Sequence, residues 1–347
     1  MRQELKQYSI AELEKSVPKQ SRVYWIDYAK GIGIFLVVIG HVCRGLTSGS
    51  ILSPLVAKSI DQWIYAFHMP IFFFLSGLLI QRSVSKSLED FIIDKLKTIA
   101  YPYFVWSIIQ GVLISAAFRY INSSISLTDL WQIIYQPIFI FWFFYVLFII
   151  TIFYKFAHDL GASPVNLLIF STFLYCLHLL KPSFLSWEVL DLICRFTIYF
   201  AIGAAISNRL MTNLSQINTS ILISITISGF LAVAATVWLN LTENQITAPL
   251  TAMIGVSATI ALAILLERFK FASYVKLWGV LSLQIYVIHT IITSGMRIII
   301  QKIFGTTEPF THVFLGTVMG IYIPIAIYWF CGKVKFRYLF TFSKSIS

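Results

Sequence analysis

The chain has 347 residues, of which 58% are hydrophobic and 12% are charged. Soluble domains carry about 25% charged residues, so this composition excludes an ordinary soluble protein and predicts a polytopic protein embedded in a lipid bilayer. A net charge of +11 would suggest nucleic acid as a partner of a soluble protein; here we expect no nucleic acid, and the charge is a guide to topology. The four cysteines are scattered without metal-site spacing, so no metal is expected.

Hydrophobic runs of membrane-spanning length recur along the chain and predict an all-α helical bundle with about ten transmembrane helices. No internal repeat divides them, so residues 23–331 are expected to form a single transmembrane domain between a polar tail (1–22) and a basic tail (332–347). In chain order the predicted spans are 26–46, 60–81, 99–118, 134–155, 164–180, 188–206, 218–239, 246–266, 275–300 and 312–331.

The distribution of Lys and Arg predicts the orientation of the bundle. If the N-terminus lies inside, the inner segments carry 18 of the 26 Lys and Arg residues and the outer segments carry five, while Lys30, Arg195 and Arg297 lie within spans. Cytoplasmic loops are enriched in these residues, so both termini and both tails are predicted to be cytoplasmic. An even number of spans agrees with this orientation.

The first span carries three ionisable residues on one helix face. At 100° per residue, Lys30 lies about 20° from His41 and Asp27 lies about 40° from it. Ionisable groups are costly in hydrocarbon, so a stripe of them indicates a reaction site or a path that faces the protein interior. The alternative is that Asp27 and Lys30 reach the headgroup region and that His41 bonds a neighbouring helix.

The second span places His68 in the outer half of the bundle. Asp61 lies seven residues earlier, about 20° away on the same helix face, and is a candidate to orient a histidine. Pro70 removes a backbone donor inside the span, which predicts a kink close to His68. The sequence leaves open whether His68 is catalytic or is a structural residue at the kink.

The ninth span places His289 at a similar depth, near or just outside the midplane. Ser282 and Tyr286 share its face, and their hydroxyls are candidates to orient the imidazole or to bind a substrate. An ordinary polar seam between helices is the alternative. The three histidines His41, His68 and His289 are therefore expected to meet in the outer half of the bundle.

Several charged residues remain as candidates for binding or support. Asp191 and Arg195 are four residues apart in the sixth span and predict a buried neutralising pair. Arg82, Lys95 and Lys97 lie between the second and third spans on the predicted cytoplasmic side. Such cations act as topology determinants and lipid contacts, and they would also meet a polyanionic ligand that arrives from inside.

Three motifs in this order carry a family resemblance. They are Lys30-x10-His41, Phe67-His-Met-Pro-x-Phe-Phe-Phe-Leu-Ser-Gly77 and Gly279-x-x-Ser-Leu-x-Ile-Tyr-x-x-His289. Together with the opening Asp27-Tyr-x-Lys-Gly31, they resemble the acyltransferase 3 family, and most closely its fucose 4-O-acetylase-like branch. The resemblance covers essentially the whole chain.

The resemblance implies a bacterial inner-membrane enzyme that moves acetyl from cytoplasmic acetyl-CoA to a hydroxyl of a cell-surface or lipid-linked glycan. It implies that His41 is the essential histidine, and that Lys30 stands where many members carry Arg and contributes to donor binding with Arg82, Lys95 and Lys97. No tightly bound cofactor is implied, and polysaccharide assembly machinery is the expected protein partner.

Alternatives remain at the level of the sequence. His41 is a candidate both for a general base and for an acyl acceptor that passes the acetyl group outward. A transporter or flippase for a glycan or a small polar solute also carries intramembrane charges, although neither paired repeats nor two matched broken helices are predicted here. A structural or sensory role would leave the three outer-half histidines unexplained.

Overall fold

The computed structural model describes residues 23–116, 127–213 and 216–342, and these form helices and turns without a β-strand. In chain order the α-helices are α2 (Tyr24–Ser48), α3 (Pro54–Tyr65), α4 (His68–Ile80), α5 (Leu88–Lys95), α6 (Tyr101–Ala116), α7 (Trp142–Asp159), α8 (Pro164–Leu180), α9 (Glu188–Asn213), α10 (Thr219–Trp238), α11 (Ala248–Arg268), α12 (Ser273–Val280), α13 (Ser282–Ile303) and α14 (Pro309–Lys333). Short π or 3₁₀ segments are η1 (Leu96–Ala100), η2 (Leu127–Ile134), η3 (Phe139–Phe141) and η4 (Ser183–Ser186).

Nine helical segments in this described part of the chain are long and apolar enough to cross a membrane. Each coincides with a predicted span, and the remaining prediction, 164–180, is the shorter apolar helix α8 of 17 residues. At 1.5 Å per residue α8 is about 26 Å long, near the lower limit for a span. The all-α polytopic membrane fold is therefore confirmed, whereas the sidedness of the termini stays a prediction. Residues 1–22 and the end of the basic tail lie outside the described residues.

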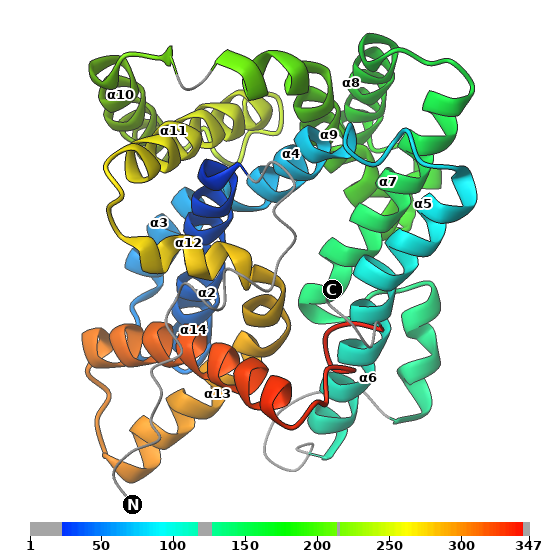
Figure 1. Ribbon diagram of the computed structural model, residues 1–347. Helices are drawn as coiled ribbons and strands as arrows, with labels where there is room; N and C mark the ends of the chain where they lie inside the picture. The colour runs from blue at the N-terminus through cyan, green and yellow to red at the C-terminus, as the bar shows by residue number, and fades with distance from the viewer. Residues whose placement is uncertain (1–22, 117–126, 214–215, 343–347) are drawn as a thin grey trace, which may run out of the picture.

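Helix α2 lies at the centre of one half of the molecule and contacts α3, α4, α11, α12, α13 and α14 (Figure 1). Helices α5, α6 and α7 lie on the other side, where α5, η1 and α6 follow one another as a single rod (Figure 1). Helix α4 packs along α9 and so connects the two sides. The ionisable residues of α2 would be costly in lipid, and this central position surrounds the helix with protein instead.

Two predicted spans are broken in the structure, although the sequence predicts them as continuous. The span 60–81 divides into α3 and α4 at Ala66 and Phe67, and the span 275–300 divides into α12 and α13 at Leu281. Pro70 accounts for the first break because a proline ring clashes with the carbonyl of the residue four positions earlier, here Ala66. Pro70 itself lies in the first turn of α4, where its missing N–H is not needed.

Glycines allow the helices around α2 to approach one another at backbone contact. A Cβ atom at Gly279 would lie 1.7 Å from the carbonyl oxygen of Asp27, and one at Gly31 would lie 1.9 Å from a backbone oxygen of α12. The α4–α9 crossing depends in the same way on Gly77 and Gly203. Small residues at helix crossings are typical of membrane bundles. The α2–α12 crossing therefore fixes the position of α2 along its axis, and with it the position of His41.

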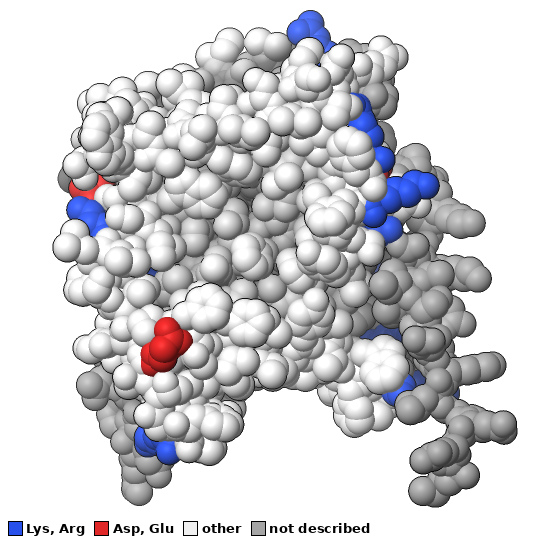
Figure 2. All heavy atoms as spheres, turned by 90° about the vertical axis from the view of Figure 1, so that its left-hand side faces the viewer, with Lys and Arg blue, Asp and Glu red and all other residues white. Residues whose placement is uncertain are grey.

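The outer surface of the bundle is largely apolar. On the face in Figure 2 few charged side chains are visible, and most lie toward its borders. Helix α10 exposes a row of large apolar side chains, namely Ile221, Ile223, Ile225, Ile227 and Leu231. Exposed apolar side chains on long helices are expected where lipid, rather than water, surrounds the protein.

Candidate active site

The three predicted histidines converge from three helices. His41 comes from the last third of α2, His68 is the first residue of α4, and His289 lies in α13. The ring centroids of His41 and His289 are 5.2 Å apart. His41 and His68 both line a cavity of about 700 Å³, whose wall also includes Tyr65 and Tyr286. The break between α3 and α4 is what turns His68 toward this cavity from the start of a helix.

Backbone carbonyls fix the tautomers of two of these histidines. Nδ1 of His68 lies 2.9 Å from the carbonyl oxygen of Ile64, and Nδ1 of His289 lies 2.7 Å from that of Tyr286. A carbonyl only accepts, so each Nδ1 carries the proton and each neutral ring keeps its lone pair on Nε2. Nε2 of His289 is buried and has no hydrogen-bond partner among the described residues. It is a proton acceptor held close to His41.

His41 differs from the other two histidines in its access to the cavity. His68 and His289 are buried to within 1% of full burial, whereas His41 is only partly buried. Within the part of the chain that the structure describes, no hydrogen bond occupies either nitrogen of His41, and the rings of His289 and Tyr65 are its aromatic neighbours. An accessible imidazole whose nitrogens are not engaged is suited to accept a proton or an acyl group.

Arg44, one of the five cations assigned above to the outer segments, was not predicted as a site residue. Arg44 lies one turn beyond His41 on α2 and lines the same cavity. Its guanidinium stacks 3.3 Å above the ring of Tyr65, and Nη2 donates to Asp61 at 2.9 Å while Nε makes a second bond to the same carboxylate. The spacing of three residues from His41 was the available signal, since it places both on one helix face.

This arrangement corrects the prediction for Asp61. Asp61 was expected to orient a histidine, but its carboxylate instead binds both sides of the Arg44 fork. Bidentate pairing of this kind fixes the plane of a guanidinium. Asp61 therefore positions a cation at the cavity wall.

Tyr286 and Ser282 differ in their relation to His289. Tyr286 lines the cavity, its ring centroid is 6.0 Å from that of His289, and its hydroxyl donates to the carbonyl oxygen of Ile140. Ser282 is the first residue of α13, two turns from His289, and does not orient it. Ser282 is therefore not the group that orients His289, because the carbonyls of the preceding helical turn bind Nδ1. Its other predicted role, substrate binding, stays a prediction.

Asp27 and Lys30 lie at the other end of α2. The helix is continuous from Tyr24 to Ser48, so the predicted common face with His41 is preserved. Eleven residues separate Lys30 from His41, which is about 16 Å along the helix. Neither Asp27 nor Lys30 lines the histidine cavity. Both lie beside the α2–α12 crossing, on the predicted cytoplasmic side.

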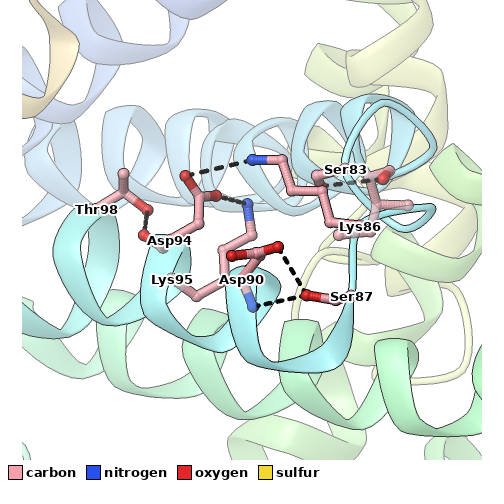
Figure 3. A network of polar contacts seen from close by, with 8 residues as sticks. Ser83, Lys86, Ser87, Asp90, Asp94, Lys95 and Thr98 are labelled. Carbon is pink, nitrogen blue, oxygen red and sulfur yellow. Dashed lines mark hydrogen bonds and ion pairs between the residues drawn. The ribbon is translucent and has the colours of Figure 1, made fainter.

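Of the predicted donor-binding cations, Lys95 lies in a polar network formed by α5 and the turn that precedes it (Figure 3). Lys95 is paired with Asp94 at 3.0 Å, and Lys86 lies 3.7 Å from the same carboxylate. Arg82 lies in the turn after α4. Lys97, in η1, is exposed and makes no ion pair or hydrogen bond with a described residue. Part of the positive charge expected here is therefore neutralised within the protein, and Lys97 is the most available cation.

The predicted pair of Asp191 and Arg195 is wrong. Oδ1 of Asp191 lies 2.6 Å from Nδ1 of His178 in α8. Arg195 is exposed and lies 5.3 Å from the ring centroid of Phe196. An i,i+4 spacing permits a pair, but a histidine on the adjacent helix reaches the carboxylate instead. In the described ranges no group of three His, Cys, Asp or Glu residues is arranged to hold a metal ion.

Comparison with known proteins identifies the family of this chain. The sequence model described as an acyltransferase domain matches residues 23–329. Nodulation protein NolL of Mesorhizobium japonicum is 34% identical over 129 residues, which is 35% of this chain and 32% of that protein, so the chain spans about a third of the relative's length. No solved structure matches the chain. Since the family match covers almost the whole bundle, the chain belongs to the acyltransferase 3 family, and its long apolar helices are those of a multi-pass membrane protein.

Proposed function

We propose that this protein is a membrane O-acetyltransferase that moves acetyl from cytoplasmic acetyl-CoA to a hydroxyl of a cell-surface or lipid-linked glycan. One observation carries the proposal: His41 lines the cavity and is accessible from it. The ring of His289, whose Nε2 has no hydrogen-bond partner among the described residues, lies next to His41, and Arg44 lies one helical turn away. A bacterial inner membrane is the proposed location, and polysaccharide assembly proteins are the proposed partners.

In the proposed reaction, His41 removes the proton from a sugar hydroxyl while the hydroxyl oxygen attacks the thioester carbonyl of acetyl-CoA. The tetrahedral intermediate collapses by breaking its C–S bond, and the leaving thiolate takes up the proton from His41. The products are an acetyl ester and free CoA, so atoms and charge balance. General base catalysis of this kind contributes about 10²–10⁴-fold.

Arg44 is the proposed stabiliser of the negative charge on the intermediate. Its guanidinium is held by Asp61 and by the face of Tyr65, and it faces the same cavity as His41. A preorganised cation aimed at the position where negative charge develops stabilises the transition state. His289 supports His41 through the lone pair on its Nε2, and His68 lines the cavity as a group that binds or orients the acceptor.

The donor is proposed to enter from the cytoplasmic side. CoA is polyanionic at its nucleotide end and has a long thin arm that ends in the thioester. Lys97 and Lys30 would attract the nucleotide end, and the arm would extend along the face of α2 that carries His41. Attraction between exposed charges is screened by salt, so donor binding should weaken as ionic strength rises.

A relay through the histidine is the second form of this proposal. His41 would attack the thioester itself, release CoA and hold the acetyl group until a sugar hydroxyl accepts it. The two forms differ in one measurement: a relay releases one equivalent of CoA per protein without acceptor, whereas direct transfer does not.

A transporter remains the second candidate function because of one specific observation. The breaks in α3–α4 and α12–α13 resemble the discontinuous helices that line transport sites. The family membership favours catalysis, however, and the first break places His68 at the start of α4 beside the cavity.

The test uses the purified protein in detergent or nanodiscs. Addition of acetyl-CoA is expected to raise its thermal stability, and addition of cell-surface polysaccharide from a strain lacking the protein is expected to release CoA thiol and leave alkali-labile acetyl groups on the polymer. Counterflow of polysaccharide fragments across vesicles without any CoA release would instead support the transporter.

A further inference from the structure

A second hollow lies beside the histidine cavity and shares part of its wall. Its volume is about 480 Å³, within the range of small-ligand sites. Phe139 and Trp142 line both spaces. The remaining walls come from the segment between η2 and η3 and from the residues that lead into α9. A ligand in this hollow would therefore be the immediate neighbour of a ligand in the histidine cavity.

The lining of the hollow combines two indole rings with short polar groups. Trp142 and Trp187 supply the rings, and Gln136, Ser186 and Glu188 supply an amide, a hydroxyl and a carboxylate. An indole face packs against the C–H face of a pyranose ring, while neighbouring polar groups bind the sugar hydroxyls. Two other ligands fit the lining less well. No Lys or Arg lines the hollow to bind a phosphate, and a lipid tail would leave the polar groups of the hollow unsatisfied. We call these five residues the tryptophan hollow.

The wall between the two spaces is held in an unusual conformation. Phe139 has a φ of +49°, a backbone conformation that residues with bulky side chains rarely adopt. Its side chain is 45% exposed. Backbone strain of this kind persists mainly at ligand and active sites. Trp142 packs against Phe196, and their ring centroids are 5.1 Å apart. The shared wall is thus built into a defined shape.

In the predicted orientation, the tryptophan hollow lies on the outer side of the membrane. The spans 134–155 and 188–206 both run inward, so Gln136 and Glu188 mark their outer ends. A surface glycan would reach this side, whereas acetyl-CoA would arrive from the other.

We propose that the tryptophan hollow is an acceptor subsite, which binds the sugar residue next to the one that is acetylated in the histidine cavity. This inference rests on the proposed function and names its acceptor more closely. Glu188 is the charged residue in the lining, so the subsite takes a neutral sugar or an amino sugar and disfavours an acidic one. The enzyme therefore binds a glycan chain more tightly than an isolated sugar.

The experiment compares two acceptors with the full-length protein. Cell-surface polysaccharide from a strain lacking the protein is used intact and after hydrolysis to monosaccharides, with radiolabelled acetyl-CoA as donor. Trp187→Ala should raise the apparent KM for the intact polymer about tenfold, which corresponds to about 1.4 kcal/mol. The KM for monosaccharides and for acetyl-CoA should not change. Glu188→Gln, which keeps the shape, should raise the polymer KM in the same selective way.

The matched control is Trp238→Ala, which removes a tryptophan that is 82% exposed at the end of α10 and does not line the hollow. Equal KM values for polymer and monosaccharides in the wild-type protein would overturn the subsite, as would an unchanged polymer KM in Glu188→Gln. The second variant decides the question if Trp187→Ala does not fold. Absence of any transfer by the wild-type protein is a different result, which contradicts the proposed function itself.

Discussion

At the scale of single residues, Arg44 lies in α2 and lines the cavity of the proposed active site. Its plane is set by Asp61 on one edge and by the ring of Tyr65 on one face. Removing the Asp61 carboxylate would leave the positive charge on Arg44, but the plane of the guanidinium would no longer be fixed. Asp61 is therefore a positioning residue, and its effect should appear in catalysis rather than in donor binding.

Asp61→Asn is expected to lower kcat about tenfold or more, because a preorganised cation loses its orientation, while the KM for acetyl-CoA stays the same. Asp61→Glu should restore part of the rate. Rates are measured as CoA release with polysaccharide present. Glu243→Gln is the matched control, since Glu243 also pairs with a cation, Lys58, at 2.9 Å but lies outside the cavity. The same loss of rate in both variants would argue against a role in orienting Arg44.

A second prediction concerns the donor site. Lys97→Ala should raise the KM for acetyl-CoA severalfold with little change in kcat, because an exposed cation attracts the nucleotide without touching the reacting atoms. Adding Lys95→Ala should increase the effect only slightly, since Lys95 is already paired with Asp94. Lys302→Ala removes an exposed lysine on the predicted outer side and should have no effect. A KM for acetyl-CoA that Lys97→Ala leaves unchanged would shift the donor site to Arg268, Lys270 and Lys276, which lie from the end of α11 to the start of α12.

The residues of the cavity were predictable where helix depth decides their position. His41, His68 and His289 were expected to meet because each lies in the outer half of its span, and the structure brings them together. The partners of charged groups were not predictable, because a carboxylate binds whichever donor reaches it across helices. Asp61 and Asp191 each bind a residue on another helix that the sequence spacing does not indicate.

At the scale of helices, the α2–α12 crossing determines where α2, the helix that carries His41, lies. Gly279→Ala would place a methyl group 1.7 Å from the carbonyl oxygen of Asp27, so the two helices must separate. Overpacking of this kind costs about 1–3 kcal/mol, and we expect a lower midpoint of thermal unfolding and reduced transfer. Gly332→Ala is the control, because nothing lies within 4 Å of its added carbon. Equal unfolding midpoints for the two variants would contradict the close crossing.

The spans themselves could be predicted from hydropathy, but their breaks could not. A run of apolar residues is the same signal whether the backbone continues or turns, so 275–300 gave no sign of the break at Leu281. The break before α4 had a signal in Pro70, which was interpreted as a kink within a continuous helix. The position of the break at Ala66 follows only when the clash of the proline ring with the fourth preceding carbonyl is considered.

At the scale of the whole molecule, the central prediction is sidedness. In a background with Cys176→Ser, which removes the exposed native cysteine, Lys86→Cys should react with a membrane-impermeant maleimide only after the cells are opened. Glu243→Cys should react in intact cells. Labelling of Lys86→Cys from outside would reverse the orientation, and it would place the tryptophan hollow on the cytoplasmic side.

The most direct test of the account is the transfer of radiolabelled acetyl from acetyl-CoA to polysaccharide by His41 variants. His41→Ala and His41→Gln should keep the thermal stabilisation by acetyl-CoA and lose transfer by at least about 10²-fold, because neither side chain accepts the proton. His158→Ala, which removes an exposed histidine at the end of α7, should transfer normally. Normal turnover by a folded His41→Ala protein would contradict a histidine-centred acyltransferase and would bring the transporter forward.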